Sequence, residues 1–363
     1  MEHQFYSLLL REIRQETPDC VSLEFEVPVS LCDVFAYRAG QYLTLRAEID
    51  GEEVRRSYSL CSAPYEGRWR VAVKEVPGGR FSTFVNRRLP KGFASGEVRL
   101  DVMPPQGDFV FDVDEQSEGF YVFFAAGSGI TPVIAMLKEG LYRESKSRFV
   151  LFYGNRTSEH IIFREELAGL KNCYSDRFSL YYVMSAEHPG SELFYGRINK
   201  EKCRVFFSTL INPEEVDDFY LCGPLGMIEE VEAVLEEFSV PSGKWHKELF
   251  TVEGAAASAK QSSTVEQRAV ARALIEVIID DEIFRFEWDG TEDNIVDAGL
   301  ANQIDMPYSC KGGVCSTCKA KVLEGEVHMR MNYALEEDQV EGGYVLSCQC
   351  VPLSEKVVLS FDD

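Results

Sequence analysis

The sequence predicts three domains in one chain: an antiparallel β-barrel, a doubly wound α/β domain and a small α+β domain. Three observations support this fold class. Short alternating runs occupy residues 5–105, apolar strands followed by helical patterns occupy residues 118–250, and an Ala/Ser-rich stretch precedes a last segment near residue 270. The length of 363 residues suits two or three domains. The expected boundaries are 1–106, 107–252 and 270–363, with a linker at 253–269.

Composition limits the class of protein. Hydrophobic residues make up 45% of the chain, and no apolar run reaches the length of a membrane span. The start, "MEHQFYSLLLREIRQE", carries acidic residues and no small-residue cleavage site, so it does not resemble a signal peptide. Eleven cysteines without a secretion signal indicate a reducing compartment and metal ligation. The expected location is the cytoplasm, without a membrane partner.

The net charge of −23 argues against nucleic acid as a partner. Acidic and basic residues number 15 and 14 over residues 1–105, 24 and 14 over 106–250, and 21 and 9 over 251–363. The last segment is therefore the most acidic for its length. An acidic surface can steer docking to a basic partner, although ordinary solubility also explains an acidic chain.

The first domain alternates in runs such as "VSLEFEV", "QYLTLRAEI" and "RWRVAVKEV", which predict short strands, and the helix-like "FSTFVNRRL" interrupts them. In the strand that ends in "RRSYSL", Arg56 and Tyr58 share one face. A forked guanidinium suits a pyrophosphate and a flat ring suits a flavin, so this pair indicates a flavin dinucleotide. An exposed strand with a salt-bridging arginine is the alternative. Downstream, "VPGGRFSTF" adds flexible glycines and the hydroxyls of Ser82 and Thr83 as a second phosphate contact.

In the second domain, "FYVFFAAG", "RFVLFYG", "FSLYYVMS" and "DFYLCG" predict buried parallel strands; helices follow the first, second and fourth, and a loop follows the third. Ligands then belong at the carboxyl ends of the strands. The glycines of "AAGSGITP" at 125–132 lie between the first strand and the first helix, whose N-terminus can face a pyrophosphate. Arg156 follows the second strand, where an adenosine 2′-phosphate would sit, and Cys222 ends another strand beside the expected nicotinamide. For Arg156 the alternative is a surface salt bridge, and for Cys222 the alternative is simple packing.

The third domain combines a hairpin, "ALIEVIIDDEIFRFEW", a short helix, "NIVDAGLANQ", and two further strands in a β-grasp-like arrangement. Its segment "YSCKGGVCSTC" spaces three cysteines as C-x₄-C-x₂-C, and a lone fourth cysteine follows, which is the plant-type spacing of a [2Fe–2S] cluster. The paired glycines let the backbone approach an anionic cluster closely. A zinc site or free thiols are the alternatives. The expected ligands are Cys310, Cys315, Cys318 and Cys348.

Cys350 competes with Cys348 for the fourth ligand position. In a strand, residues two apart point to the same face, so both sulfurs would be available. We prefer Cys348 because it keeps the ferredoxin-like pattern, and we assign Cys350 to packing.

The motifs R-x-Y-S, G-S-G-I-T-P and C-G-P-x-x-M, in this order over about residues 5–250, resemble the ferredoxin–NADP reductase superfamily, and residues 270–363 resemble a plant-type ferredoxin. The domain order and motifs are most similar to the reductase subunits of phenylacetyl-CoA epoxidases, which are multicomponent di-iron monooxygenases. The resemblance implies an NADPH-dependent oxidoreductase of phenylacetate catabolism that passes electrons through FAD and a [2Fe–2S] cluster to its oxygenase. A reductase for a ring-hydroxylating oxygenase or desaturase, a redox sensor, and a zinc module attached to a flavin domain are the alternatives.

The same resemblance implies roles for individual residues. Ser59 would lie near flavin N5, and "KELF" gives Glu248 and Phe250 the spacing of the Glu-x-Tyr end of plant-type reductases. Because this chain continues beyond Phe250, that residue need not cover the flavin, and core packing is the alternative. The implied catalytic residues are Ser59, Cys222 and Glu248. The implied cofactor-binding residues are Arg56, Tyr58, Ser59, Val73, Lys74, Gly79, Ser82, Thr83, Gly127, Ser128, Gly129, Ile130, Thr131, Arg156, Gly223, Pro224, Met227 and Phe250.

Overall fold

The computed structural model describes residues 4–250 and 270–362. The chain forms two compact units, one from residues 7–54 and 58–250 and the other mainly from residues 270–362. The predicted linker at 253–269 lies outside the described residues. Within the described ranges, no helix is long and apolar enough to cross a membrane.

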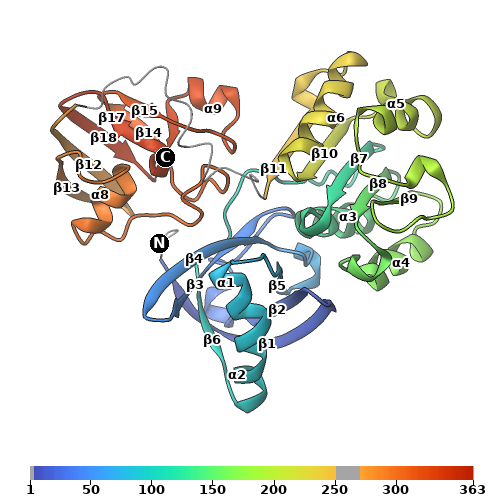
Figure 1. Ribbon diagram of the computed structural model, residues 1–363, viewed down its shortest axis with the longest axis horizontal. Coiled ribbons are helices and arrows are strands. Elements are labelled where there is room, and N and C mark those ends of the chain that lie inside the picture. Colours follow the sequence, from blue (N-terminus) through green and yellow to red (C-terminus); the bar gives the residue numbers. More distant parts are fainter. Residues whose placement is uncertain (1–3, 251–269, 363) are drawn as a thin grey trace. The chain divides into compact units, whose positions relative to one another are not determined.

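The first domain is a six-stranded barrel with the strand order β4-β3-β6-β1-β2-β5 (Figure 1). A bridge between Leu60 and Val71 joins the ends of the two edge strands and closes the sheet. A helical excursion lies between β5 and β6, as "FSTFVNRRL" predicted. The strands are β1 (Tyr6–Thr17), β2 (Cys20–Glu26), β3 (Tyr42–Ile49), β4 (Glu52–Ser59), β5 (Trp69–Lys74) and β6 (Arg99–Val102), and the helices are α1 (Arg80–Thr83) and α2 (Leu89–Ser95), joined by a π-helical turn, Phe84–Arg88.

The second domain is a parallel sheet with the order β11-β10-β7-β8-β9. Its inner strands are almost continuously apolar because helices cover both faces of such a sheet. The order reverses between β7 and β10, so their carboxyl ends form the crevice where ligands bind in this architecture. The elements are β7 (Phe120–Ala126), α3 (Ile130–Arg143), β8 (Arg148–Asn155), α4 (Arg164–Cys173), β9 (Phe178–Met184), α5 (Lys200–Thr209), β10 (Asp218–Gly223), α6 (Leu225–Glu237) and β11 (Trp245–Leu249).

The prediction of a loop after β9 is wrong for residues 200–209, which form the helix α5. The side chain of Asn199 caps this helix by accepting a hydrogen bond from the backbone N–H of Lys202 at 3.0 Å. Cys203, Phe206 and Phe207 are buried at helical spacing. The asparagine cap followed by apolar residues at helical spacing could therefore have predicted this helix from the sequence.

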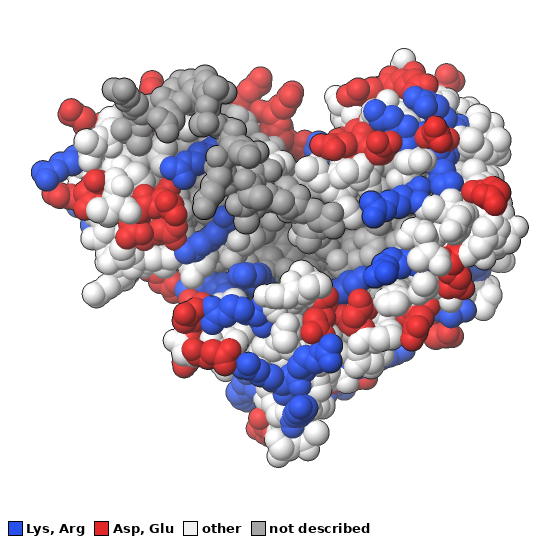
Figure 2. Space-filling view, in the orientation of Figure 1, with Lys and Arg blue, Asp and Glu red and all other residues white. Residues whose placement is uncertain are grey.

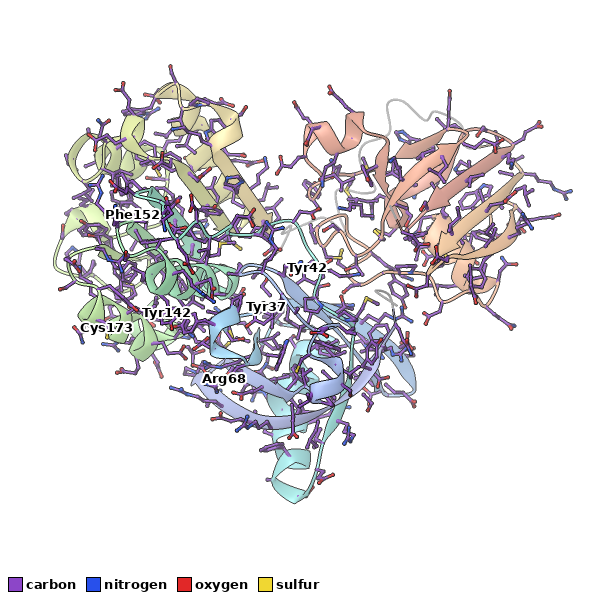
Figure 3. All side chains as sticks on the ribbon, turned by 180° about the vertical axis from the view of Figure 1, so that it is seen from behind. Tyr37, Tyr42, Arg68, Tyr142, Phe152 and Cys173 are labelled. Atoms are coloured by element: carbon purple, nitrogen blue, oxygen red, sulfur yellow. The ribbon has the colours of Figure 1, made fainter. Side chains whose placement is uncertain are left out.

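The barrel and the α/β domain share one hydrophobic core. Cys20, Cys61 and Ala72 of the barrel belong to the same buried cluster as Phe123 and Tyr153 of the parallel sheet. Figure 3 places Tyr42 in the barrel and Phe152 in the α/β sheet, and both are buried. These two domains therefore form one compact unit.

The C-terminal domain confirms the predicted α+β class. Its main sheet has the order β13-β12-β18-β14-β16, with β12 and β18 parallel and β12 and β13 forming the predicted hairpin. A separate two-stranded pair, β15 and β17, and the helix α9 were not predicted. The elements are β12 (Ala273–Ile279), β13 (Glu282–Trp288), α8 (Ile295–Ala301), β14 (Lys319–Glu324), β15 (Val327–Met329), α9 (Glu337–Glu341), β16 (Tyr344–Leu346), β17 (Cys350–Pro352) and β18 (Lys356–Ser360).

Candidate functional site

Strand β4 ends in the residues predicted to bind a flavin nucleotide. Arg56 is exposed, Tyr58 is half-buried with its ring 5.8 Å from that of Phe81, and Ser59 is buried. A guanidinium, an aromatic ring and a hydroxyl thus occur within four consecutive residues of one strand. This donor set fits the pyrophosphate and ring system of FAD.

The turn at residues 76–83 uses one of its predicted phosphate ligands for its own structure. The hydroxyl of Ser82 accepts a hydrogen bond from the backbone N–H of Val76 at 3.1 Å and donates to the carbonyl oxygen of Gly79 at 3.3 Å. A Cβ at position 79 would lie 2.5 Å from that hydroxyl, so a larger residue there would displace the Ser82 side chain. Since the single proton of Ser82 is used, Thr83 and backbone N–H groups are the better candidates for a phosphate contact.

The glycine-rich turn after β7 contacts the end of β10. A Cβ at Gly129 would overlap the carbonyl oxygen of Cys222, so only glycine allows the two turns to meet. Gly127 has a φ of 55°, and its carbonyl oxygen accepts a hydrogen bond from the Tyr153 hydroxyl at 2.9 Å. Helix α3 begins directly after this turn, which provides free N–H groups for an anion.

The other residues predicted for this turn have different surroundings. Ser128 is half-buried, whereas Ile130 and Thr131 are buried. The Thr131 hydroxyl donates to the carbonyl oxygen of Ser128 at 3.0 Å. The buried residues Ile130 and Thr131 therefore stabilise the turn, whereas Ser128 stays accessible to a ligand.

The remaining predicted ligands surround the same crevice. Lys74, at the end of β5, has its ammonium group 3.9 Å from the Cβ position of Gly127, and its neighbour Val73 is buried. Arg156 is exposed directly after β8. At the start of α6, Pro224 is exposed, whereas Met227 is buried with its methyl group 2.8 Å from the Cβ position of Gly223.

The three residues predicted to be catalytic lie together. Cys222 and Glu248 are paired in the parallel register of β10 and β11, and the Ser59 hydroxyl donates to Glu248 Oε2 at 3.2 Å. This hydrogen bond connects the barrel to the α/β sheet. Phe250 follows β11 and is half-buried against the shared core, in line with the packing alternative.

Burial sets the protonation states in this cluster. Desolvation raises the pKa of Glu248 to about 8, against the lowering effect of the hydrogen bond from Ser59. Burial, and then the charge of Glu248, raises the pKa of the Cys222 thiol well above its usual value. Near pH 7 these pKa shifts favour the neutral forms of the Glu248 carboxyl group and the Cys222 thiol.

The cysteine loop of the C-terminal domain brings its four predicted ligands together in two pairs. The thiols of Cys310 and Cys315 share a hydrogen bond, and so do those of Cys318 and Cys348. Together with backbone N–H groups, the Cys315 hydrogen bond lowers the pKa of Cys310 to about 6. Among the described residues, no three His, Cys, Asp or Glu side chains are placed to hold a single metal ion. Two pairs of sulfurs instead suit a cluster in which each of two irons takes two cysteines.

The assumption that Cys348 and Cys350 share a strand is wrong. Cys348 lies in a 3₁₀ turn, Ser347–Gln349, and Cys350 begins β17. The Cys350 thiol is fully buried and donates to the carbonyl oxygen of Leu346 at 3.2 Å, whereas Cys348 contacts Cys318. This geometry supports the preference for Cys348 as the ligand.

One polar neighbour of the cysteines was missed. Gln349 is buried, and its side-chain amide donates to the carbonyl oxygen of Lys311 at 3.0 Å and lies 3.5 Å from the sulfur of Cys348. It links two parts of the loop that lie 38 positions apart in the sequence. No local pattern could have indicated this contact.

Comparisons with known proteins agree with this geometry. The chain matches the models of an oxidoreductase FAD-binding domain at residues 7–111, an oxidoreductase NAD-binding domain at 123–233 and a 2Fe-2S iron-sulfur cluster binding domain at 277–353. It is 41% identical to a 1,2-phenylacetyl-CoA epoxidase subunit of Escherichia coli (strain K12), over 99% of this chain and 98% of that protein. It is 33% identical to the 3-ketosteroid-9-alpha-monooxygenase ferredoxin reductase component of Rhodococcus rhodochrous, over 98% and 96% of the two chains.

Solved structures show the same three-domain fold. Phthalate dioxygenase reductase aligns over 98% of both chains with a TM-score of 0.58 and 22% identity. A type IV self-sufficient cytochrome P450 monooxygenase aligns over 98% of this chain and 41% of its own, with a TM-score of 0.65 and 22% identity. The predicted fold class is confirmed, as is the use of FAD, a [2Fe–2S] cluster and a pyridine nucleotide.

Proposed function

Since this chain belongs to the oxygenase reductases that combine an FAD-binding, an NAD-binding and a 2Fe-2S domain, we propose that it carries electrons from NADPH to the oxygenase component of a phenylacetyl-CoA epoxidase. Its similarity to a component of such an epoxidase, over 99% of the chain, supports this partner. A ketosteroid monooxygenase is the second candidate partner, because a reductase component of that system is 33% identical.

The observation that carries the electron path is the contact between Ser59 and Glu248. It joins the flavin strand β4 to β11, and Glu248 is paired with Cys222 beside the glycine turn. When bound, FAD accepts a hydride from a nicotinamide and releases electrons singly, as a [2Fe–2S] cluster requires. The chain's own residues serve to bring the two nucleotides together and to keep water from the point of transfer.

We assign the binding roles as follows. Arg56 binds the FAD pyrophosphate and Tyr58 packs on the flavin ring. The backbone of Gly127–Gly129 binds the pyrophosphate of NADPH at the start of α3, with Lys74 beside it. The paired cysteines at 310, 315, 318 and 348 hold the cluster.

The direct test is reconstitution. The purified protein should contain FAD, iron and acid-labile sulfide in a ratio of about 1:2:2. With NADPH it should reduce cytochrome c and should support product formation by the oxygenase subunits of a phenylacetyl-CoA epoxidase, including its di-iron subunit. Product formation with ketosteroid monooxygenase subunits, but not with epoxidase subunits, would favour the second partner. Stoichiometric zinc without sulfide would contradict the presence of an iron–sulfur cluster.

Arg156 is proposed to distinguish NADPH from NADH. Arg156→Ala should lower kcat/KM for NADPH by about tenfold or more, because a charged hydrogen bond to the 2′-phosphate is lost, while the value for NADH stays unchanged. Arg148→Ala is the matched control, since Arg148 is an exposed arginine at the opposite end of the same strand. An unchanged NADPH:NADH ratio in Arg156→Ala would show that this residue does not contact the phosphate.

The acidic C-terminal domain is proposed to steer docking to the oxygenase. Residues 251–363 carry 21 acidic and 9 basic residues, and Figure 2 shows acidic and basic side chains interspersed on one face of the molecule. Turnover of the oxygenase should slow as ionic strength rises, because the Debye length is about 10 Å at 0.1 M salt. Reduction of a small dye at saturating NADPH is the control and should change less. An oxygenase rate that stays constant with salt would remove the steering role.

A further inference from the structure

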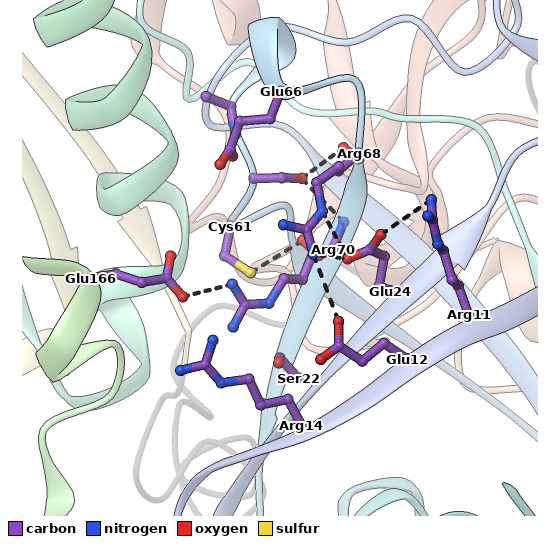
Figure 4. Close-up of polar contacts among 12 residues, drawn as sticks. Arg11, Glu12, Arg14, Ser22, Glu24, Cys61, Glu66, Arg68, Arg70 and Glu166 are labelled. Atoms are coloured by element: carbon purple, nitrogen blue, oxygen red, sulfur yellow. Dashed lines mark hydrogen bonds and ion pairs between the residues drawn. The ribbon is translucent and has the colours of Figure 1, made fainter. Parts of the chain in front are cut away.

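Arg70 of β5 is a buried arginine that contacts both domains of the first unit. Its guanidinium is bonded to Glu16 of β1 and, at 2.7 Å, to Glu166 of α4, and its side chain is 7% exposed. It also lies 5.1 Å from the centre of the Phe163 ring. Figure 4 shows Glu166 approaching Arg70 from a different part of the chain. Arg70 therefore links a barrel strand to a helix of the α/β domain.

Helix α3 is attached to the barrel by a second set of contacts. The ammonium group of Lys138 lies 2.8 Å from Glu166, 3.5 Å from Glu66 and 3.4 Å from the carbonyl oxygen of Cys61. The carboxylate of Glu139 accepts a hydrogen bond from the backbone N–H of Tyr65 at 3.1 Å. We call the group formed by Glu16, Glu66, Arg70, Lys138 and Glu166 the interdomain ion network.

The charges in this network depend on each other. Burial alone would raise the pKa of Glu166, but the positive charges of Lys138 and Arg70 outweigh it and lower that pKa. Removing one partner would leave another charge buried without compensation. Phe163 immediately precedes α4 with a φ of 59°, a strained conformation for an aromatic residue, and its ring packs against Arg70. Unlike apolar packing, such directional contacts favour one orientation of the two domains.

The elements held by the network also carry the nucleotide crevice. Strand β5 bears Arg70 and ends at Lys74, beside the Gly127 turn. Helix α3 bears Lys138 and begins directly after that turn. We propose that the interdomain ion network positions the glycine turn against the flavin strand, and so sets the distance over which the hydride passes. This inference rests on the proposed function, since it assumes that both nucleotides bind at this crevice.

The test compares variants that break the network with one that breaks an ion pair inside the barrel. Glu166→Gln and Arg70→Met each weaken the ion pair between Arg70 of the barrel and Glu166 of the α/β domain. Arg68→Met is the control, because Arg68 is bonded to Glu24 of the same barrel. The measurement is anaerobic stopped-flow reduction of the bound FAD at saturating NADPH, with the FAD content and the melting temperature of each variant determined in parallel.

We expect the limiting rate of flavin reduction to fall about tenfold or more in both network variants, because small misplacements of reacting groups are costly. The apparent affinity for NADPH should change little. The double variant should be no slower than the slower single variant, since both break one connection. Arg68→Met should lower the melting temperature without slowing flavin reduction.

If Glu166→Gln retains FAD and its flavin is reduced as fast as in the parent, the network is structural only and the inference fails. If Arg70→Met does not fold, Glu166→Gln and Lys138→Met still decide the question. A parent protein whose flavin is reduced by neither NADPH nor NADH would instead contradict the proposed function.

Discussion

Replacing Cys348 by serine should abolish the iron–sulfur cluster, whereas Cys350→Ser should retain it. Cys348 meets Cys318 in one of the two sulfur pairs, while the Cys350 thiol is bonded to the carbonyl oxygen of Leu346 inside the core. Loss of a ligand should cost more than the roughly 10- to 100-fold in metal affinity that an outer-shell change costs. Iron content, sulfide content and the absorption of the cluster measure this directly.

The same pair of variants separates the two electron-transfer steps. In Cys348→Ser, NADPH should still reduce the flavin, because the residues of the crevice belong to another compact unit. Reduction of cytochrome c through the cluster should fall close to background. A Cys350→Ser protein without iron, beside a Cys348→Ser protein that keeps it, would reverse the ligand assignment.

The second large effect is expected at Glu248. Glu248→Ala removes the hydrogen bond from Ser59 that joins β4 to β11, and flavin reduction at pH 7 should fall about 10- to 100-fold because a contact that aligns the two nucleotide sites is lost. Glu248→Gln is the matched variant. It keeps the shape and the hydrogen bond, and it mimics the neutral carboxyl group that a pKa of about 8 implies at pH 7. Its rate should therefore stay close to that of the parent at pH 7.

The raised pKa of Glu248 also predicts how stability depends on pH. Its pKa is about 8 in the folded protein and near the ordinary 4.5 in the unfolded chain. Between these values the folded state binds more protons than the unfolded state, so this group's contribution to stability falls as the pH rises from about 4.5 to about 8. Comparing melting temperatures at pH 5 and pH 9 should show a smaller loss in Glu248→Gln than in the parent. Equal losses would mean that Glu248 titrates normally.

Local patterns were enough to predict much of this molecule. The alternation in the barrel, the strand–helix order of the second domain and the spacing of Cys310, Cys315 and Cys318 each depend on neighbours in the sequence. The class of each domain, the flavin dinucleotide and the [2Fe–2S] cluster could therefore be predicted before any contact was known, whereas the reductase function was implied by the resemblance of the motifs to a known superfamily. Even the helix at 200–209, which was missed, had a local signal in Asn199 and the apolar spacing after it.

The contacts between distant residues were decided only by the tertiary structure. Ser59 and Glu248 lie 189 positions apart, and Arg70 and Glu166 lie 96 apart. No periodicity relates such residues, because their meeting depends on how the barrel packs on the parallel sheet and on the charges buried between them. The same holds for Cys348 and Cys350, which look equivalent as neighbours in the sequence. The 3₁₀ turn at Ser347–Gln349 directs one sulfur to Cys318, and the start of β17 directs the other into the core.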